Sequence, residues 1–408
     1  MTPIKVAFFT TFLDLLGFGI IIPIQPFYAE SFGASPATIT LLGASYSLMQ
    51  FLFSGLIGKI SDRVGRRPVL LVSVALIILG YIAFAQATSL GGLFIARMIS
   101  GIGGANLGAA QAIIADVTPA DQRSRGMGII GAAFGLGFIF GPALGGWLGQ
   151  WGPLYPIYLA AGLAGLNWLF IFFKLPETLD KTKLESVDLL HADQSKPLSF
   201  SQLVKVQNLP YLLSISLFFT MSFALMEQTI GLFIERAWLA NIIDASIRHS
   251  EAAALTAYFL VAVGIGASIV QGGLIGKLTK RWGEVRLCQA GILIVGLTFL
   301  LIPQLSSGAS FGYMLLIGLV MATGTGMLHP SRNSLLSQAV SSAQQGRILG
   351  LNQSLAALGR VMGPASAGLL FEYNINLPFW VGGTVIICSW VLTLKLKPPT
   401  SNAAPYSA

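Results

Sequence analysis

Charged residues and cysteine are scarce in this sequence, and each shortage excludes a class of protein. Only 10% of the 408 residues are Asp, Glu, Lys or Arg, whereas soluble domains carry about 25%. Both cysteines, Cys288 and Cys388, fall inside long apolar runs, which argues against a disulfide framework or a metal cluster. No Gly-x-x-x-x-Gly-Lys-Ser/Thr pattern for nucleotide binding occurs. We therefore expect no metal, no cofactor and no enzymatic activity.

Apolar residues are abundant instead, at 54% of the chain, and the mean hydropathy is +0.75. Crossing a bilayer as a helix takes about 20 apolar residues. Twelve candidate runs lie at 5–28, 37–58, 68–88, 92–113, 126–148, 154–173, 209–234, 252–276, 287–303, 310–330, 347–370 and 377–394. Because strand-like alternation is absent, we predict an all-α membrane protein with twelve transmembrane helices, not a β-barrel. The first run contains Asp14 and lacks a cleavage site, so we expect a retained helix.

The basic residues predict the orientation of the chain. With the N-terminus in the cytoplasm, 20 of the 24 Lys and Arg residues fall in cytoplasmic loops and tails, and only Arg236 and Arg248 fall outside. This satisfies the positive-inside rule. We therefore expect a multi-pass membrane protein with both termini cytoplasmic. The net charge of +8 then reflects topology, not a nucleic-acid partner.

The chain repeats itself across a polar connection. Residues 174–208 contain five Lys and five acidic residues and are predicted to be a cytoplasmic linker between two six-helix bundles, 1–173 and 209–408, the second with a short cytoplasmic tail. GLIGKISDRVGRR (55–67) resembles GLIGKLTKRWGEV (273–285), and residues 125–146 align with 347–368. Parallel repeats of this kind are related by a pseudo-twofold axis along the membrane normal.

Three motifs and one helix sequence carry a resemblance to a known family. They are Gly58-Lys-Ile-Ser-Asp-Arg-Val-Gly-Arg-Arg67, Arg97-Met-Ile-Ser-Gly101, the glycine series of 128–146, and Asp14-Leu-Leu-Gly-Phe-Gly-Ile-Ile-Ile-Pro-Ile-Gln-Pro26. With them the chain resembles the major facilitator superfamily over all twelve helices. Within it, the chain is similar to drug–proton antiporters, and above all to bacterial tetracycline efflux pumps, which implies a location in a bacterial inner membrane. The motifs are shared by pumps of many substrates and do not name this one.

The resemblance implies a gate on the cytoplasmic side. Asp62 would meet the positive end of the helix at 347–370, and Arg66 would pair with Asp116, when the cavity faces outward. In the second half, Lys280 replaces the acid and Glu284 replaces the first arginine of the closing pair, so we expect the stronger latch in the first half. The predicted gate comprises Gly58, Asp62, Arg63, Gly65, Arg66, Arg67 and Asp116.

The predicted helix 126–148 is rich in glycine, which a membrane helix tolerates because small residues let backbones approach closely. Two interpretations stay open: simple close packing, or a seam in the outer half around which the bundles rock. The resemblance favours the second and implies a barrier to leak. The motif comprises Gly128, Gly137, Gly141, Pro142, Gly145 and Gly146.

Four charged residues lie deep in predicted spans, where each costs about 2.5–3.5 kcal/mol on insertion scales, so they are functional candidates. Asp14 and Glu227 are the candidates for proton coupling. Arg97 and Arg360 are candidates for tuning charge or binding substrate, and the resemblance places Arg97 near Asp14. The alternative is a structural ion pair for Asp14, a polar helix contact for Glu227 and a structural anchor for Arg97.

Seven further residues are candidates for a central cavity, although each also fits plain helix packing. They are Tyr46, Gln50, Asn106, Phe134, Phe138, Gln271 and Gln353.

The sequence is therefore interpreted as a monomeric, proton-coupled antiporter that exports amphipathic drugs or drug-like metabolites by alternating access. Its partners would be a small-molecule substrate, protons and the lipid bilayer. The alternatives are a proton-coupled symporter or facilitator for a small nutrient or metabolite, and a non-transporting membrane sensor.

Overall fold

The computed structural model describes residues 3–118, 123–179, 206–305, 310–340 and 342–398. Within these ranges, the side chains of 115, 123–132, 134 and 342–347 are not described. The first group of helices is α1 (Pro3–Ile21), α2 (Gln25–Glu30), α3 (Pro36–Val64), α4 (Arg66–Ala85), α5 (Leu90–Gly103), α6 (Leu107–Val117), α7 (Arg123–Gly149) and α8 (Leu154–Lys174). The second is α11 (Leu209–Trp238), α12 (Ala245–Ile269), α13 (Ile275–Leu301), α14 (Phe311–Gln338), α15 (Ser342–Tyr373) and α16 (Leu377–Thr393).

Among the described residues, these helices make twelve membrane spans, as predicted. Nine segments are long and apolar enough to cross a membrane, and one of them, Ala245–Gln304, is 60 residues long. That segment contains two spans, because Gly283 has φ 75° and breaks α13. The shorter apolar helices Gly135–Gly149 and Leu377–Thr393 complete the set.

Several helices extend beyond the predicted apolar runs. α14 continues through Pro330 to Gln338, so Arg332, expected in a loop, is buried in the helix instead. Likewise α12 continues into α13 through a π-helix at Val270–Leu274. The reason is that hydropathy marks the part of a helix that crosses hydrocarbon, whereas helical hydrogen bonding continues into the interfacial region.

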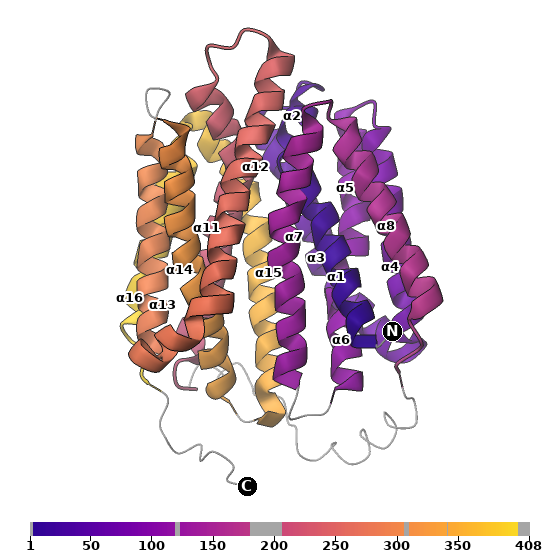
Figure 1. Ribbon diagram of the computed structural model, residues 1–408, viewed down its shortest axis with the longest axis vertical. Helices are drawn as coiled ribbons and strands as arrows, with labels where there is room; N and C mark the ends of the chain where they lie inside the picture. Colours follow the sequence, from indigo (N-terminus) through magenta and orange to yellow (C-terminus); the bar gives the residue numbers. More distant parts are fainter. Residues whose placement is uncertain (1–2, 119–122, 180–205, 306–309, 341, 399–408) are drawn as a thin grey trace.

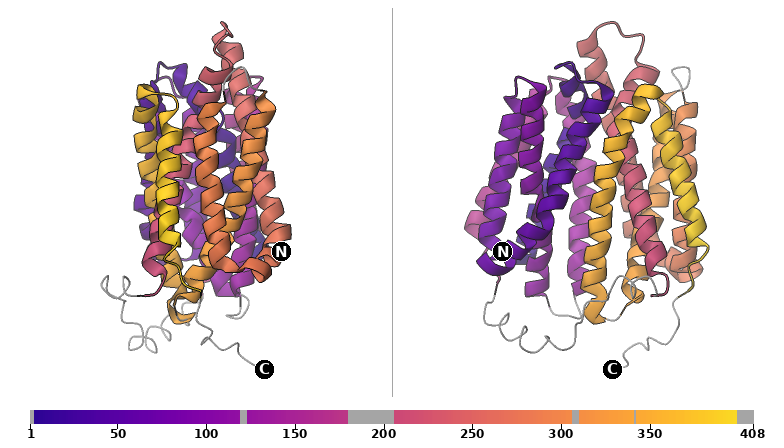
Figure 2. Two further views of the ribbon diagram at one scale, coloured as in Figure 1. Left: turned by 90° about the vertical axis from the view of Figure 1, so that its left-hand side faces the viewer. Right: turned by 180° about the vertical axis from the view of Figure 1, so that it is seen from behind.

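The helices gather in two groups, a first bundle of α1–α8 and a second bundle of α11–α16 (Figure 1). The bundles meet where α3 packs on α15 and α7 packs on α12. The start of α1 and the end of α16 lie at the same end of the molecule (Figure 2). We call this end, where Arg66 and Arg67 lie, the basic face, and the other end the opposite face.

The two bundles contact each other on the opposite face. The backbone N–H of Ala37, in the first turn of α3, donates to Glu372 Oε1 of α15 at 3.0 Å. Gly368 of α15 approaches the backbone of Pro36 so closely that a Cβ at Gly368 would lie 2.5 Å from the Pro36 carbonyl oxygen.

The bundles stand apart near the basic face. A Cβ added at Gly55 or Gly58 of α3, or at Gly350 of α15, would meet no atom of the described residues within 4 Å. The structure therefore represents a state that is closed on the opposite face and open on the basic face.

Candidate functional site

A cavity of about 130 Å³ lies at the middle of the helices, lined by the first bundle and by Arg360 of α15. Four of the predicted cavity residues line it together with Asp14: Tyr46, Gln50, Asn106 and Phe138. Gln271 and Gln353 are exposed and do not line this cavity, because the side chains at their helix positions face away from it. The side chain of Phe134 is outside the described residues.

Asp14 of α1 is held in this cavity by two neutral amides. Asn106 Nδ2 donates to Asp14 Oδ2 at 2.7 Å, and Asn167 Nδ2 donates to Oδ1 at 3.0 Å. Asn106 ends the 3₁₀ turn that joins α5 to α6, so a local change of helix type presents its amide to α1. Neutral donors satisfy the carboxylate without fixing its charge, which leaves Asp14 able to bind and release a proton.

Arg97, which the resemblance places near Asp14, is buried in α5 and contacts Tyr46 of α3. Its guanidinium lies over the Tyr46 ring, 4.6 Å from the ring centroid, and its Nε has no hydrogen-bond partner. No ion pair between Arg97 and Asp14 occurs among the described residues. The planar guanidinium stacks on the aromatic face, and an influence of Arg97 on the charge of Asp14 stays a prediction.

The Tyr46 ring continues into an aromatic column across the cavity. Phe18 of α1 lies 5.2 Å from Tyr46, and Phe138 of α7 lies 6.3 Å from Phe18, as centroid distances. The cavity is thus lined by these three rings, by the guanidinium of Arg360 and by the carboxylate of Asp14. This combination suits a flat amphipathic molecule with a polar group, because apolar walls with a few placed polar groups are typical of ligand sites.

The second bundle contributes the other predicted charges. Glu227 of α11 is half-buried, and its Oε1 accepts no hydrogen bond. Glu227 and Arg360 attract each other electrostatically, and Arg360 lines the cavity on the side facing the first bundle. The two bundles therefore provide different carboxylates: one is held by neutral amides and the other is balanced by a cation.

The glycine motif of α7 faces two different partners. A Cβ at Gly137 would lie 2.7 Å from Leu15 Cβ, and one at Gly141 would lie 2.7 Å from Gly19 Cα, both in α1 of the same bundle. Gly145 also abuts α1, at the Ile20 carbonyl, and Pro142 lies against Gly19.

By contrast, Gly146 abuts the second bundle. Its Cβ would meet Ala257 Cβ of α12 and would lie 3.1 Å from the Ala253 carbonyl oxygen. The motif is thus divided between packing within the first bundle and the seam between bundles. The surroundings of Gly128 are outside the described side chains.

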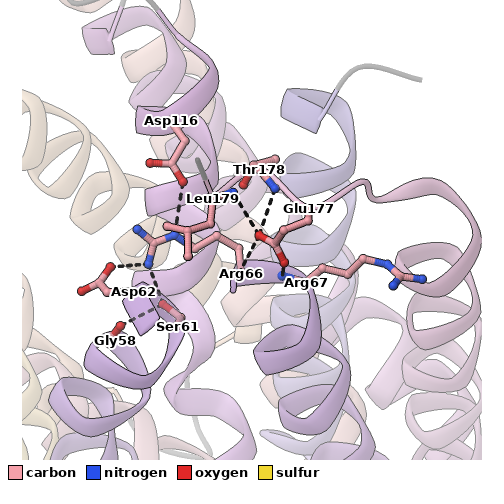
Figure 3. Close-up of polar contacts among 9 residues, drawn as sticks. All are labelled: Gly58, Ser61, Asp62, Arg66, Arg67, Asp116, Glu177, Thr178 and Leu179. Carbon is pink, nitrogen blue, oxygen red and sulfur yellow. Dashed lines mark hydrogen bonds and ion pairs between the residues drawn. The ribbon is translucent and has the colours of Figure 1, made fainter. Parts of the chain in front are cut away.

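A network of polar contacts surrounds Arg66 at the basic face (Figure 3). Arg66 Nε contacts Asp116 Oδ2 at 3.2 Å, and its Nη1 contacts Ser61 Oγ at 2.7 Å and also the Asp62 carboxylate. Gly65 turns the chain between α3 and α4 with φ 124°, a conformation that side chains rarely adopt. The Arg66–Asp116 pair implied by the resemblance is therefore present.

Two other gate residues, Asp62 and Arg63, are exposed to solvent in this state. The side chain of Asp62 is 55% exposed, and Arg63 is exposed. Asp62 binds Arg66, four residues along the chain. The side chains of the first turns of α15 lie outside the described residues, so the contact of Asp62 with that helix stays a prediction. In the second half, Glu284 Oε1 accepts from Ser334 Oγ at 3.3 Å and Gln338 Nε2 at 3.4 Å, neutral contacts where the first half has ion pairs.

Two residues of these sites were missed by sequence reasoning. Asn167 is the only amide in the apolar run 154–173, a signal that could have identified it. Glu177 accepts from the backbone N–H groups of Arg66 at 2.9 Å and Arg67 at 3.2 Å and so caps α4, whose own N-cap, Gly65, has no side chain (Figure 3). Nothing in its local sequence indicates that contact. Arg67 also donates to the Phe172 carbonyl oxygen at 2.7 Å.

Comparisons with known proteins agree with this arrangement. The family model described as Major Facilitator Superfamily matches residues 7–364 and 238–407. The chain is 32% identical to tetracycline resistance protein, class B, of Escherichia coli over 94% of this chain and 91% of that protein. It is 30% identical to multidrug resistance protein 2 of Bacillus subtilis (strain 168) over 96% and 94%.

A crystal structure of the human organic anion transporter MFSD10 superposes with a TM-score of 0.68 at 25% identity, covering 96% of this chain and 98% of that one. A transporter of the POT family crystallised with 5-aminolevulinic acid gives a TM-score of 0.75 at 17% identity, covering 96% and 95%, which shows the fold alone. These matches fit the twelve spans and the motifs described above. The chain belongs to the major facilitator superfamily, whose members are transporters and not enzymes.

Proposed function

We propose that the protein is a proton-coupled antiporter that exports amphipathic drugs or drug-like metabolites across a bacterial inner membrane. The basic face lies in the cytoplasm, both termini are cytoplasmic, and the protein works as a monomer by alternating access. The names of the relatives, tetracycline and multidrug resistance proteins, support export of drugs. No nucleic acid is involved, because the basic charge follows the cytoplasmic loops.

The observation that carries the proposal is Asp14 in the central cavity, held by two amide donors and without an ion pair to any described residue. In the outward-open state, Asp14 takes a proton from outside as the substrate leaves. In the state described here, the cavity faces the cytoplasm, and an incoming substrate favours release of that proton. Glu227, attracted electrostatically by Arg360, is the second coupling group and sits on the bundle that moves relative to Asp14.

The cavity also constrains the substrate. Pockets for drug-sized ligands usually enclose about 300–1,000 Å³, more than the 130 Å³ present here. The cavity in this state therefore accepts only part of such a molecule, and the bundles separate further at the basic face to admit the rest.

The proton gradient is sufficient for this work. A proton moving through about 150 mV releases roughly 3.5 kcal/mol, at 2.3 kcal/mol per 100 mV. At about 1.4 kcal/mol per tenfold, this supports roughly a 300-fold gradient of a neutral substrate for each proton. No nucleotide is required.

The test is proton movement in inverted membrane vesicles energised by respiration, followed with a pH-sensitive dye while a panel of drugs is added. We expect drug-dependent proton efflux in the wild type, its loss in Asp14→Asn, and normal activity in the control Glu251→Gln, an exposed carboxylate outside the cavity. Active pH-driven efflux in the double variant Asp14→Asn, Glu227→Gln would overturn the mechanism. Proton flux in the reverse direction would indicate a symporter, and ligand binding without flux would indicate a sensor.

A further inference from the structure

A cluster of three titratable groups joins the bundles on the opposite face. His249 Nε2, near the start of α12, lies 3.3 Å from Glu30 Oε2 and 3.4 Å from Glu235 Oε1. Glu30 ends α2 of the first bundle, whereas Glu235 and His249 belong to the second. One imidazole thus bridges a carboxylate from each bundle, at the place where the bundles must part for the cavity to open outward.

Charged groups on every neighbouring element contribute to this cluster. From α11, Arg236 lies 3.6 Å from Glu30 Oε1; from α12, Arg248 Nε donates to Glu235 Oε1 at 2.8 Å. From α15, Glu372 acts on Arg236 electrostatically. Asp244 is engaged elsewhere, because its Oδ1 accepts the backbone N–H groups of Ser246 and Ile247 at the start of α12. The Phe27 ring covers His249 at 5.5 Å.

Water reaches the cluster from outside. The cluster of Glu30, Glu235 and His249 borders a surface hollow of about 600 Å³, which is also lined by Gly33, Ala34 and Ala240. The 30 residues of α11 span about 45 Å, at 1.5 Å per residue, more than the roughly 30 Å of a hydrocarbon core. The end of α11 that carries Glu235 therefore lies beyond the hydrocarbon, where protons exchange freely.

The surroundings favour a proton over a metal ion. The three donor atoms lie within 4.8 Å of one another, a spacing that a divalent cation could use. However, Arg248 already occupies Glu235 Oε1, and Arg236 faces Glu30, so a divalent cation would sit among two fixed positive charges. A proton adds one charge only, directly between two carboxylates, and imidazole is the side chain that ordinarily titrates between pH 5 and 8.

We propose that Glu30, Glu235 and His249 form a proton-binding clasp that holds the opposite face closed when His249 is protonated. A proton bound from outside gives His249 a positive charge, and the imidazolium attracts Glu30 across the bundle interface. Loss of that proton leaves a neutral ring, and the interface weakens. External protons would thus close the opposite face behind a departing substrate. The clasp rests on alternating access but not on Asp14, so either proposal can fail without the other.

The experiment measures the separation of the bundles directly. Spin labels at Thr88→Cys and Asn241→Cys, exposed in the turns after α4 and α11, report the distance across the opposite face. The labels go into the full chain in lipid nanodiscs, with the native cysteines replaced as Cys288→Ala and Cys388→Ser. Double electron–electron resonance then gives the closed and open populations between pH 5.5 and pH 9.5.

We expect the closed-to-open ratio to fall by at least tenfold as the pH rises, with a midpoint on the alkaline side of about pH 6.5, where a free imidazole titrates. His249→Gln, a neutral donor of similar reach, should favour the open state at every pH. His249→Lys, a permanent cation, should restore the closed state and remove its pH dependence. The control His191→Gln, in the connection between bundles, should behave as the wild type.

Two results would overturn the clasp. One is a wild-type pH profile in His249→Gln, which would assign the titration to another group. The other is a closed population that responds to micromolar Zn²⁺ but not to pH, which would make the cluster a metal site. The rescue by lysine separates a charge effect from simple packing, because a structural role for the ring would not be replaced by an ammonium group.

Discussion

Replacing Gly146 with alanine should shift the transporter toward its outward-open state. The added methyl would overlap Ala257 Cβ of α12 and would lie 3.1 Å from the Ala253 carbonyl oxygen. The carbonyl oxygen is a backbone atom and the Cβ is bonded directly to the backbone, so neither can move away by a side-chain rotation. The strain can be relieved only if α7 and α12 separate, and these helices belong to different bundles.

The size of the shift follows from the cost of overpacking, which is typically about 1–3 kcal/mol. Since about 1.4 kcal/mol corresponds to a factor of ten, the closed-to-open ratio on this face should fall by roughly 5- to 150-fold. The Thr88–Asn241 spin-label pair measures this ratio, and thermal unfolding measures stability in parallel.

Two matched substitutions on α7 isolate the effect. Gly135→Ala places its Cβ 3.6 Å from Ser268 Oγ, an ordinary contact, and should change nothing. Gly141→Ala crowds Gly19 Cα and the Leu16 carbonyl oxygen of α1 and should lower the unfolding temperature without moving the label distance. An unchanged population in Gly146→Ala, or an equal shift in Gly141→Ala, would refute the division of the motif into intra-bundle and inter-bundle contacts.

Three further predictions concern the site and the basic face. Asn167→Leu removes a donor to Asp14; hydrogen bonds to charged groups contribute about 1.5–3 kcal/mol, so the pH of half-maximal drug-driven proton release should rise by at least one unit, and an unchanged profile would contradict the role of this amide. Gly65→Ala forces a side chain to φ 124° and should lower stability by about 1–3 kcal/mol, whereas Gly58→Ala, in open space, should leave stability unchanged in denaturant melts. Glu177→Ala uncaps α4 and should cost about 1 kcal/mol, measured as faster amide hydrogen exchange in its first turn; exchange at the wild-type rate would show that the cap is not needed.

Much of the site could be predicted from residue type alone. Asp14, Arg97, Glu227 and Arg360 were identified because ionisable residues are expensive in hydrocarbon and persist only where they act. The pairing of Arg66 with Asp116 came from the family motif. The stacking of Arg97 on Tyr46 could not be predicted, because a stacked guanidinium and a paired one are the same residue in a sequence.

Contacts between distant segments outside the family motifs could not be predicted. Asn167 meets Asp14 across 153 positions, and Glu177 caps a helix that begins 111 positions earlier. Both depend on how α8 and the chain that follows it pack on the first bundle. Side-chain periodicity describes one helix at a time and carries no information about which helix faces it.

The sequence by itself determined that the protein lies in a membrane, how many spans it has and which orientation to expect, because the bilayer imposes length, hydropathy and charge rules on each segment independently. The family followed from the motifs. Only the tertiary structure decided the conformational state, in which Glu372 accepts from the backbone of α3 and His249 lies between Glu30 and Glu235 on the opposite face. It also decided that Gly141 and Gly146, five residues apart in one motif, face different bundles. The physical reason is that contacts between bundles depend on relative placement, and alternating access requires one sequence to support two such placements.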